Sequence, residues 1–534
     1  MSSSSRGHAG VDGCSRGGHL RSGPRGTSRD LWHPGAVPRE TDDRPPLPSL
    51  TQLQRRAIDV LTRMAPDAVP LGEAFRAAGH ELALVGGPVR DAFLGRVSND
   101  LDFATSATPD EAEPLLAAWG DAHWDVGREF GTVGARRFAG RRGAGSADVV
   151  VEVTTYRTDE YDASSRKPVV AFGDTLEGDL SRRDFTVNAM AVRVPDLVFV
   201  DPFGGLADLA ARVLRTPVDP RQSFDDDPLR MMRAARFVAQ LGFDLDDAAR
   251  AAVVDMAERI TIVSAERVRD ELVKLLLAPH ARAGLELLVD TGLADHVLPE
   301  LPALRLEIDE HHRHKDVYEH SLMVLQKAIA LETGPDGAVP GPDLVLRLAA
   351  LLHDIGKPRT RRFEPGGGVS FHHHEVVGAK LVAKRLKALR FDKQTVQDVS
   401  RLTELHLRFH GYGEGEWTDS AVRRYVTDAG PLLERLHRLT RSDSTTRNTR
   451  KAARLSAAYD DLEARIAALR EQEELAAIRP DLDGTQIMAA LGLPPGREVG
   501  EAYRFLLELR MERGPLGEDA AREELLRWWE TRTG

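Results

Sequence analysis

The chain is poor in the features that cross-link or anchor many proteins. Its 534 residues contain a single cysteine, Cys14, which excludes a disulfide framework and a thiolate metal site. That scarcity fits a reducing compartment, and we expect a cytoplasmic protein. No uninterrupted apolar run is long enough to span a bilayer, so we expect no membrane partner.

Positive charge is also in short supply. The net charge of −11 argues against a surface that binds nucleic acid everywhere. Any RNA contact must therefore depend on local basic patches and metal ions. One such patch, between Arg423 and Arg454, contains Arg435, Arg438, Arg441, Arg447, Arg450 and Lys451. It fits RNA contact and a solvated helix face equally well.

What is present is ordinary globular sequence after a polar start. Residues 1–48 have few large apolar side chains, and we expect a disordered extension. The pattern then predicts two helices and four strands, at 50–64, 71–79, 81–85, 100–104, 149–155 and 191–200. Nearly every later periodic segment is helical. The predicted organisation is an α/β head at 49–205, an all-α neck at 206–305, a second helical domain at 306–460 and a helical tail at 461–534.

A glycine turn follows the first predicted strand. In the segment LVGGPVRD, Gly86 and Gly87 allow backbone N–H groups to approach a phosphate closely. Pro88 suits the first position of a helix, whose positive end would face the turn. Gly95 is a suitable helix stop. The segment therefore predicts a phosphate-binding turn.

Two carboxylates come next in the sequence. Asp100 and Asp102 occupy alternate positions of a strand and so point to the same face. Like charges on one face repel unless a cation lies between them, and hard oxygen ligands suit Mg²⁺. Such a pair is common on surface strands, but the glycine turn favours a metal–triphosphate site. Glu152, the lone charge in the apolar run 149–153, fits a third metal ligand or a structural salt bridge equally well.

A third segment combines an acid and arginines at helical spacing. Asp227, Arg230, Arg233 and Arg236 recur every three residues, along one helix face. On composition alone, a salt-bridged surface would explain them. However, an aspartate accepts and an arginine donates, whereas C and A both present an amino donor beside a ring-nitrogen acceptor. A fixed Asp227–Arg230 pair could therefore admit C and A and reject G and U.

These segments resemble the class II CCA-adding tRNA nucleotidyltransferases, which include bacterial poly(A) polymerases and belong to the polymerase-β superfamily. The resemblance covers about residues 80–280. Its segments are LVGGPVRD with DLD, EVTTYR, RRDFTVNAMA, DPFGGLADL, DDPLRMMRAARF and SAERVRDEL. One departure is Asp226, where the family commonly has glutamate. The full loop at 157–172 resembles that of enzymes that add all three nucleotides.

The resemblance implies an activity and residue roles. Asp100 and Asp102 match positions that bind catalytic Mg²⁺, with Glu152 as a further catalytic candidate. Asp227 and Arg230 match a protein template for the incoming base. The predicted nucleotide-binding residues are Gly86, Gly87, Arg90, Arg183, Asp227, Arg230, Arg233 and Arg236. The implied reaction adds CMP, CMP and AMP from CTP and ATP to a tRNA 3′ end, without a nucleic-acid template, and releases pyrophosphate.

A second constellation lies in the second helical domain. His353 and Asp354 end an apolar helix, and HDIGKP in such a setting resembles the HD phosphohydrolase domains. That resemblance implies a site for a divalent metal of unknown identity, made of His320, His353, Asp354 and Asp443. His374 and His406 match second-metal positions, although the adjacent His372 and His373 leave the first of these open. The domain either hydrolyses phosphoesters, such as 2′,3′-cyclic phosphates on damaged tRNA, or is an inactive RNA-binding remnant.

Three other functions are compatible with these motifs. A poly(A) polymerase shares the head motifs, but it usually has a basic tail and no HD domain. An HD phosphohydrolase could use the head only to bind RNA. A non-catalytic tRNA-binding protein would not need the carboxylates at all.

Overall fold

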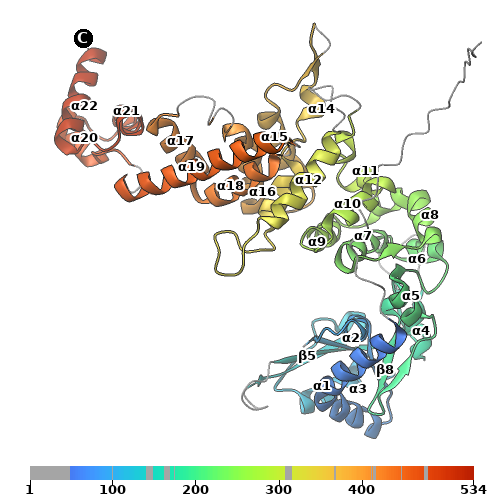
Figure 1. The fold of residues 1–534 in the computed structure, drawn as a ribbon. Coiled ribbons are helices and arrows are strands. Elements are labelled where there is room, and N and C mark those ends of the chain that lie inside the picture. Colours follow the sequence, from blue (N-terminus) through green and yellow to red (C-terminus); the bar gives the residue numbers. More distant parts are fainter. Residues whose placement is uncertain are drawn as a thin grey trace, which may run out of the picture. The chain divides into compact units, whose positions relative to one another are not determined.

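The computed structural model describes residues 49–98, 100–139, 148–160, 169–173, 175–306, 316–365, 368–409, 412, 417–444, 446, 448–473 and 479–533. The extension expected at 1–48 lies outside these residues. Among the described helices, none is both long and apolar enough to cross a membrane. As predicted, a mixed α/β head comes first and an almost entirely helical region follows (Figure 1).

The head contains a seven-stranded sheet in which β2 and β5 are parallel and the other neighbours are antiparallel. Its strands, in spatial order, are β3 (Ala122–Trp124), β4 (Thr132–Arg137), β5 (Val149–Thr155), β2 (Asp100–Thr105), β1 (Leu82–Val85), β8 (Ala191–Val194) and β9 (Val198–Val200). The strand expected at 191–200 is therefore two strands, because the Val194–Pro195 segment turns the chain back. Sequence reasoning missed β3, which has only three residues, and β4, which carries a glycine and two arginines.

Successive side chains of the central strands point to opposite faces of the sheet, and apolar residues are buried on both faces. In β1, Leu82 and Leu84 join the larger core, and Ala83 and Val85 join a smaller one. The larger core includes apolar residues of α1 (Leu50–Ala77) and α3 (Pro109–Trp119). The smaller core includes residues of α4 (Leu176–Ser181). The sheet therefore lies between helices, and α4 covers only part of its second face.

The two helices predicted at 50–64 and 71–79 are a single helix, α1, with Pro66 and Pro70 inside it. Proline usually ends a helix, which is why the sequence suggested a break there. Instead, one buried stripe continues across the prolines, formed by Leu53, Ala57, Val60, Met64, Ala68, Leu71 and Phe75. Burial of that stripe outweighs the hydrogen bonds lost at the two prolines.

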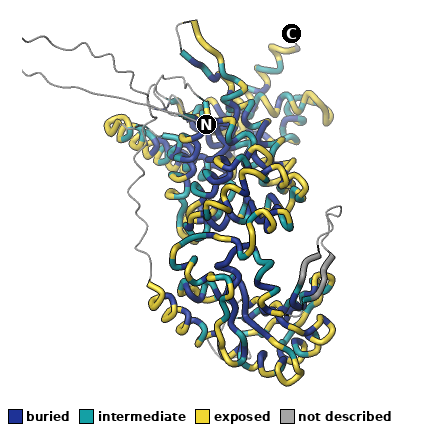
Figure 2. Tube along the Cα trace, turned by 90° about the vertical axis from the view of Figure 1, so that its right-hand side faces the viewer, coloured by how far each residue is buried: buried dark blue, intermediate teal, exposed yellow. Residues whose placement is uncertain are grey.

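The region after the head is helical apart from short two-stranded ladders and 3₁₀ turns. Its α-helices are α5 (Gly205–Ala211), α6 (Pro220–Asp226), α7 (Leu229–Leu241), α8 (Asp247–Met256), α9 (Ala265–Leu276), α10 (Ala281–Asp290), α11 (Leu293–Val297), α12 (Val317–Ala330), α13 (Leu344–Leu352), α14 (Lys357–Thr360), α15 (His374–Ala388), α16 (Lys393–Leu405), α17 (Asp419–Ala429), α18 (Leu433–Asp443), α19 (Thr449–Glu473), α20 (Gly484–Leu491), α21 (Arg497–Arg513) and α22 (Glu518–Thr533). Buried segments run through most of these helices (Figure 2). The last three helices enclose a separate apolar cluster that includes Leu506 and Leu525.

A buried polar network joins the head to α7. The Asp184 carboxylate accepts hydrogen bonds from Asn188 Nδ2 at 2.9 Å and from Arg233 Nε at 2.8 Å. Asn188 in turn accepts from Arg90 Nη1 at 2.7 Å. Burial raises the pKa of Asp184, but Arg233 and the hydrogen bonds outweigh burial and lower the pKa to about 2. An ionised Asp184 therefore holds α2 (Gly87–Phe93), the segment after α4 and α7 together.

Asp184→Asn should destabilise the protein at neutral pH. Because the folded-state pKa lies below the ordinary value, the contribution is present above about pH 4 and is lost as the pH falls toward 2. We expect a loss of about 2 kcal/mol at pH 7 that shrinks below pH 4, measured by calorimetric melting. Asp225→Asn, which removes an exposed ion pair with Arg259, is the control and should change little. Equal melting of the two variants at pH 7 would contradict this role of Asp184.

Candidate functional site

The glycine turn lies at the end of β1. Gly86 has φ 71°, a backbone conformation that side chains disfavour, and Gly87 begins α2. Pro88 is thus the second helical residue rather than the first, as the sequence had suggested. α2 ends at Phe93, and Gly95, with φ 76°, follows as the expected stop. The turn therefore leaves β1 sharply and places backbone N–H groups at the edge of the sheet.

The carboxylates stand beside this turn because of strand register. β1 and β2 are antiparallel with Leu84 opposite Phe103, so the turn after Val85 reaches the start of β2. Asp100 and Asp102 are both exposed and point to the face that α4 partly covers. The structure thus places the predicted pair next to the predicted turn.

Glu152 is the neighbour of Asp102 in the sheet. The two residues are paired in parallel strands, so their side chains share a face. Loss of hydration raises the pKa of Asp102, Glu152 raises it further, Arg183 lowers it and Asp100 raises it. This repulsion is what a cation would relieve. Among the described residues, the three carboxylates do not bring ligand atoms within 4.8 Å of one another, so Glu152 as a metal ligand stays a prediction.

Arg183 lies over the glycine turn. A side chain at residue 86 would place its Cβ only 2.8 Å from Nη1 of Arg183. The positive charge of the guanidinium also lowers the pKa of Asp102. The site therefore combines backbone donors, a cation and carboxylates, as the binding of a metal–triphosphate requires.

Asp227 and Arg230 lie one helical turn apart, and both side chains already have hydrogen-bond or ion-pair partners within the protein. Asp227 accepts from the Leu229 N–H at 3.1 Å, and its other oxygen lies 3.3 Å from Arg267 Nη2. Arg230 is buried and donates to the Ser223 hydroxyl at 2.9 Å and to the Arg182 carbonyl at 2.5 Å. Sequence reasoning did not identify Arg267. Recognition of the base by Asp227 and Arg230 stays a prediction. It requires that each side chain can form a hydrogen bond to the base in addition to, or in place of, the contacts described.

The other predicted arginines surround one aromatic ring. The guanidinium carbons of Arg90, Arg233 and Arg236 lie 5.4, 5.7 and 4.2 Å from the centre of the Phe237 ring. Arg236 also pairs with Glu271 at 2.7 Å. Phe237 was not singled out from the sequence, because an aromatic at helical spacing usually belongs to the core. The Phe237 ring thus contacts three arginines of the predicted nucleotide site, one on α2 and two on α7.

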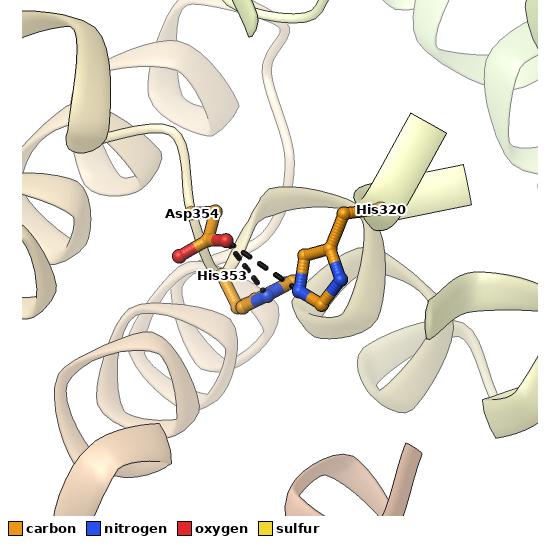
Figure 3. Close-up of side chains that lie close together, drawn as sticks. All are labelled: His320, His353 and Asp354. Carbon is orange, nitrogen blue, oxygen red and sulfur yellow. Dashed lines mark ion pairs between the residues drawn. The ribbon is translucent and has the colours of Figure 1, made fainter. Parts of the chain in front are cut away.

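A second site gathers histidines and carboxylates from several helices. It contains His320 of α12 and His353 and Asp354 after α13 (Figure 3). Asp443, at the end of α18, belongs to it as well. His320 Nε2 lies 2.9 Å from Asp443 Oδ1, and His353 Nε2 lies 3.3 Å from Asp354 Oδ2. His320, His353 and Asp354 bring ligand atoms within 4.8 Å of one another. The structure therefore brings together all four predicted ligands.

Asp354 also belongs to a second triad with His374 and His406. Its Oδ1 atom lies 3.2 Å from His374 Nε2 and 3.9 Å from His406 Nε2. His374 is buried while His372 and His373 are exposed, which resolves the choice that the sequence left open. One carboxylate thus faces two adjacent candidate metal positions, one oxygen toward each.

Three of these histidines are oriented in the same way. The Nδ1 atoms of His353, His374 and His406 lie 2.9, 2.8 and 2.6 Å from the carbonyl oxygens three residues earlier. Each Nδ1–H can therefore donate to the backbone, which leaves the Nε2 lone pair directed into the cluster. Nε2 of His353 is buried and has no hydrogen-bond partner among the described residues. This donor set fits divalent metal ions.

Buried carboxylates dominate the electrostatics of this cluster. Burial lowers the pKa of His353, but Asp354 and Asp443 outweigh burial and raise the pKa to about 10. Burial and the neighbouring His353 lower the pKa of His406 to about 3. Lys357 Nζ also lies 2.9 Å from Asp354 Oδ2 and adds a second positive charge beside the carboxylates. A bound divalent ion would supply further positive charge at the same place.

The basic patch of the second helical domain is largely a salt-bridged helix face. Arg435 pairs with Asp343 at 2.7 Å, Arg438 with Glu434 at 3.0 Å, and Arg441 with Asp460 at 2.7 Å. Arg447 lies outside the described residues, and Arg450 and Lys451 are exposed on α19. Only this last part fits RNA contact.

Gly86→Ala should weaken nucleotide binding. The new methyl group would require both a positive φ and a displaced Arg183. We expect the Kd for CTP to rise by about tenfold, the effect of disturbing one charge-assisted contact. Titration calorimetry measures this Kd. Gly204→Ala is the matched control, since Gly204 has φ 73° and no described atom lies within 4 Å of its Cβ position. Unchanged CTP affinity in Gly86→Ala would contradict the assignment of the turn.

Family models match three successive parts of the chain. A poly A polymerase head domain matches residues 82–215, a probable RNA and SrmB-binding site of polymerase A matches 242–304, and an HD domain matches 317–469. Each match lies in a region where sequence motifs predicted a corresponding domain. The exact domain boundaries proposed from the sequence stay predictions.

One relative matches most of the chain, and others match about half of it. The A-adding tRNA nucleotidyltransferase of Deinococcus radiodurans is 36% identical over 464 residues, 85% of this chain and 96% of the relative. The CCA-adding enzyme of a Geobacillus species is 43% identical over 40% of this chain and 50% of its own length. The structure of the Bacillus stearothermophilus CCA-adding enzyme in complex with CTP is 25% identical, with a TM-score of 0.61 over 88% of this chain and 98% of that one. The chain belongs to the class II tRNA nucleotidyltransferases, the family of the A-adding and CCA-adding enzymes.

Proposed function

We propose that this chain adds CMP, CMP and AMP to the 3′ end of tRNA, taking them from CTP and ATP. The observation that carries the proposal is the placement of Asp100 and Asp102 beside the Gly86 turn and Arg183. The likeness to an A-adding tRNA nucleotidyltransferase and to a CCA-adding enzyme supports tRNA as the acceptor. We also propose a cytoplasmic location, where tRNA and nucleoside triphosphates meet.

The reaction forms one bond and breaks one. The terminal hydroxyl oxygen of tRNA attacks the α-phosphorus, the bond from that phosphorus to the bridging oxygen breaks, and pyrophosphate leaves. Asp100 and Asp102 would hold Mg²⁺, with Glu152 raising the local negative charge. Bound Mg²⁺ supplies a lowered hydroxyl pKa and neutralises charge on the triphosphate. Gly86, Gly87 and Arg183 would bind the triphosphate oxygens.

Selection of the base belongs to Asp227 and Arg230 in this proposal. Arg230 is buried and donates hydrogen bonds to the carbonyl of Arg182 and the hydroxyl of Ser223. These bonds fix the position of its guanidinium, the hydrogen-bond donor of the Asp227–Arg230 pair. Rigid polar groups discriminate strongly, because a mismatched base leaves them unpaired. No nucleic-acid template is then needed.

The second candidate is a terminal A-adding enzyme. It is favoured by one observation, that the relative matching 85% of this chain is named A-adding. Three acceptors separate the candidates: tRNA ending at the discriminator base, tRNA ending in CC, and a generic RNA. An A-only enzyme extends the second acceptor with ATP and leaves the first unchanged. A poly(A) polymerase makes long tails on the third.

We predict that tRNA ending at the discriminator base gains two residues with CTP alone and three with CTP and ATP. Product length on sequencing gels measures this. Asp102→Ala should slow every addition by on the order of 10²–10³-fold, because it removes transition-state charge stabilisation. Asp196→Ala, an exposed acid in the turn between β8 and β9, is the matched control and should retain activity. No incorporation of CTP or ATP by the purified chain would defeat the proposal.

The HD domain supports a separate activity. We propose that its two triads bind divalent metal ions and hydrolyse phosphoesters, with Asp354 facing both metal positions. Hydrolysis of a 2′,3′-cyclic phosphate consumes one water and breaks one phosphorus–oxygen bond. The buried, oriented Nε2 atoms favour an active site over a remnant that has lost its chemistry.

Addition of Mn²⁺ or Ni²⁺ to metal-free protein should raise its melting temperature and start hydrolysis of 2′,3′-cyclic AMP. His353→Ala should lose both effects and keep nucleotide addition, because His353 lies in the HD cluster alone. Asp102→Ala should show the reverse pattern. Absence of both melting shift and hydrolysis in the unaltered protein with Mn²⁺, Ni²⁺ and Co²⁺ would contradict an active HD domain.

A further inference from the structure

Asp179 is a buried carboxylate that neither motif analysis nor the proposed chemistry uses. It lies on α4 with only 1% of its surface exposed. One oxygen accepts from Arg182 Nη2 at 2.9 Å, and the other accepts from Arg183 Nη2 at 3.0 Å. Their spacing of three and four residues along the chain gives these contacts. A single buried acid thus holds the two adjacent arginines.

The contact fixes how Arg183 is turned. Nε and Nη2 of Arg183 both lie near the same Asp179 oxygen, at 3.3 and 3.0 Å. One edge of the planar guanidinium is therefore taken up by the carboxylate. The remaining nitrogen, Nη1, is the atom 2.8 Å from the Cβ position of Gly86. The clamp on one edge directs the opposite edge at the glycine turn.

We propose that Asp179 is a positioning residue that orients the Arg183 guanidinium toward the triphosphate at the Gly86 turn. The inference rests on the proposed function. Asp179 would then contribute to nucleotide binding, although a carboxylate without neighbouring cations repels a phosphate. Asp179 is buried, and Arg182 and Arg183 balance its negative charge. Nη1 of Arg183 lies at the glycine turn, where it can meet a phosphate.

The electrostatics of the region support this arrangement. Burial raises the pKa of Asp179, but Arg183 and Arg182 outweigh burial and leave the pKa below its ordinary value. The carboxylate is therefore ionised at neutral pH and keeps both arginines. The segment is fixed from the other side as well, because the Arg182 carbonyl accepts from Arg230 of α7 at 2.5 Å. Arg183 is thus anchored between α4 and α7.

The test is a double-mutant cycle on the full chain, read as the KM and kcat for CTP with tRNA ending at the discriminator base. Asp179→Asn keeps the side-chain shape but removes the charge that orients Arg183. We expect the KM to rise by about ten- to a hundredfold, the range for losing a hydrogen bond to a charged group, with a smaller change in kcat. In an Arg183→Gln background the same substitution should add no further increase, because the residue it acts through is gone.

Glu177→Gln is the matched control on the same helix. Glu177 is exposed and pairs with Arg193 at 3.0 Å, away from the turn, so its KM should stay at the unaltered value. An equal KM in Asp179→Asn and Glu177→Gln would overturn the inference while the unaltered protein remains active. Additive effects of Asp179→Asn and Arg183→Gln would also overturn it, because they indicate a purely structural acid. If the unaltered protein incorporates no CTP, the proposed function itself fails instead.

Should Asp179→Asn fail to fold, Arg183→Lys provides the second test. Lysine keeps the positive charge but lacks the planar fork that Asp179 holds by one edge. A KM raised as far as in Arg183→Gln supports the inference, because orientation is then what matters. A KM equal to that of the unaltered protein contradicts it, because charge alone then suffices.

Discussion

The antiparallel pairing of β1 with β2 is the constraint on which the nucleotide site depends. Leu84 lies opposite Phe103, so the chain that leaves β1 must turn beside the first residues of β2. That register brings a phosphate-binding turn and two carboxylates together, although Gly86 and Asp100 lie fourteen positions apart along the chain. A shift by one residue would move Asp100 and Asp102 into the apolar face, where their charges could not be solvated.

The rest of the site is built around this edge by buried ion pairs. Asp179 holds Arg182 and Arg183 on one side of the turn, and Asp184 holds Arg233 through a network that reaches Arg90. In both cases a buried acid keeps a cation in place, and the cation is the group suited to a phosphate. Removing one partner of such a buried pair destabilises the fold, because the other charge is left unpaired, and the intact pair fixes the geometry of the cation.

Much of the fold and part of the site could be predicted from the sequence. The two-residue period of a strand predicted that Asp100 and Asp102 share a face, and the two adjacent glycines predicted the turn at Gly86. For Glu152 the sequence left a metal ligand and a salt bridge open, because the strand pairing that sets Glu152 beside Asp102 is not encoded in the spacing of either residue. His374 could be separated from His372 and His373 only by burial. The helix break expected at Pro66 was wrong, because tertiary burial outweighed local propensity.

Nucleotide addition is proposed to occur where β1 ends and β2 begins. A crystal structure of the full chain with CTP and Mn²⁺, examined in an anomalous difference map, tests it most directly. The account predicts an anomalous peak contacting Asp100 and Asp102, with the triphosphate on Gly86, Gly87 and Arg183. Bound CTP whose triphosphate lies away from the glycine turn, with no peak at the two carboxylates, would contradict it.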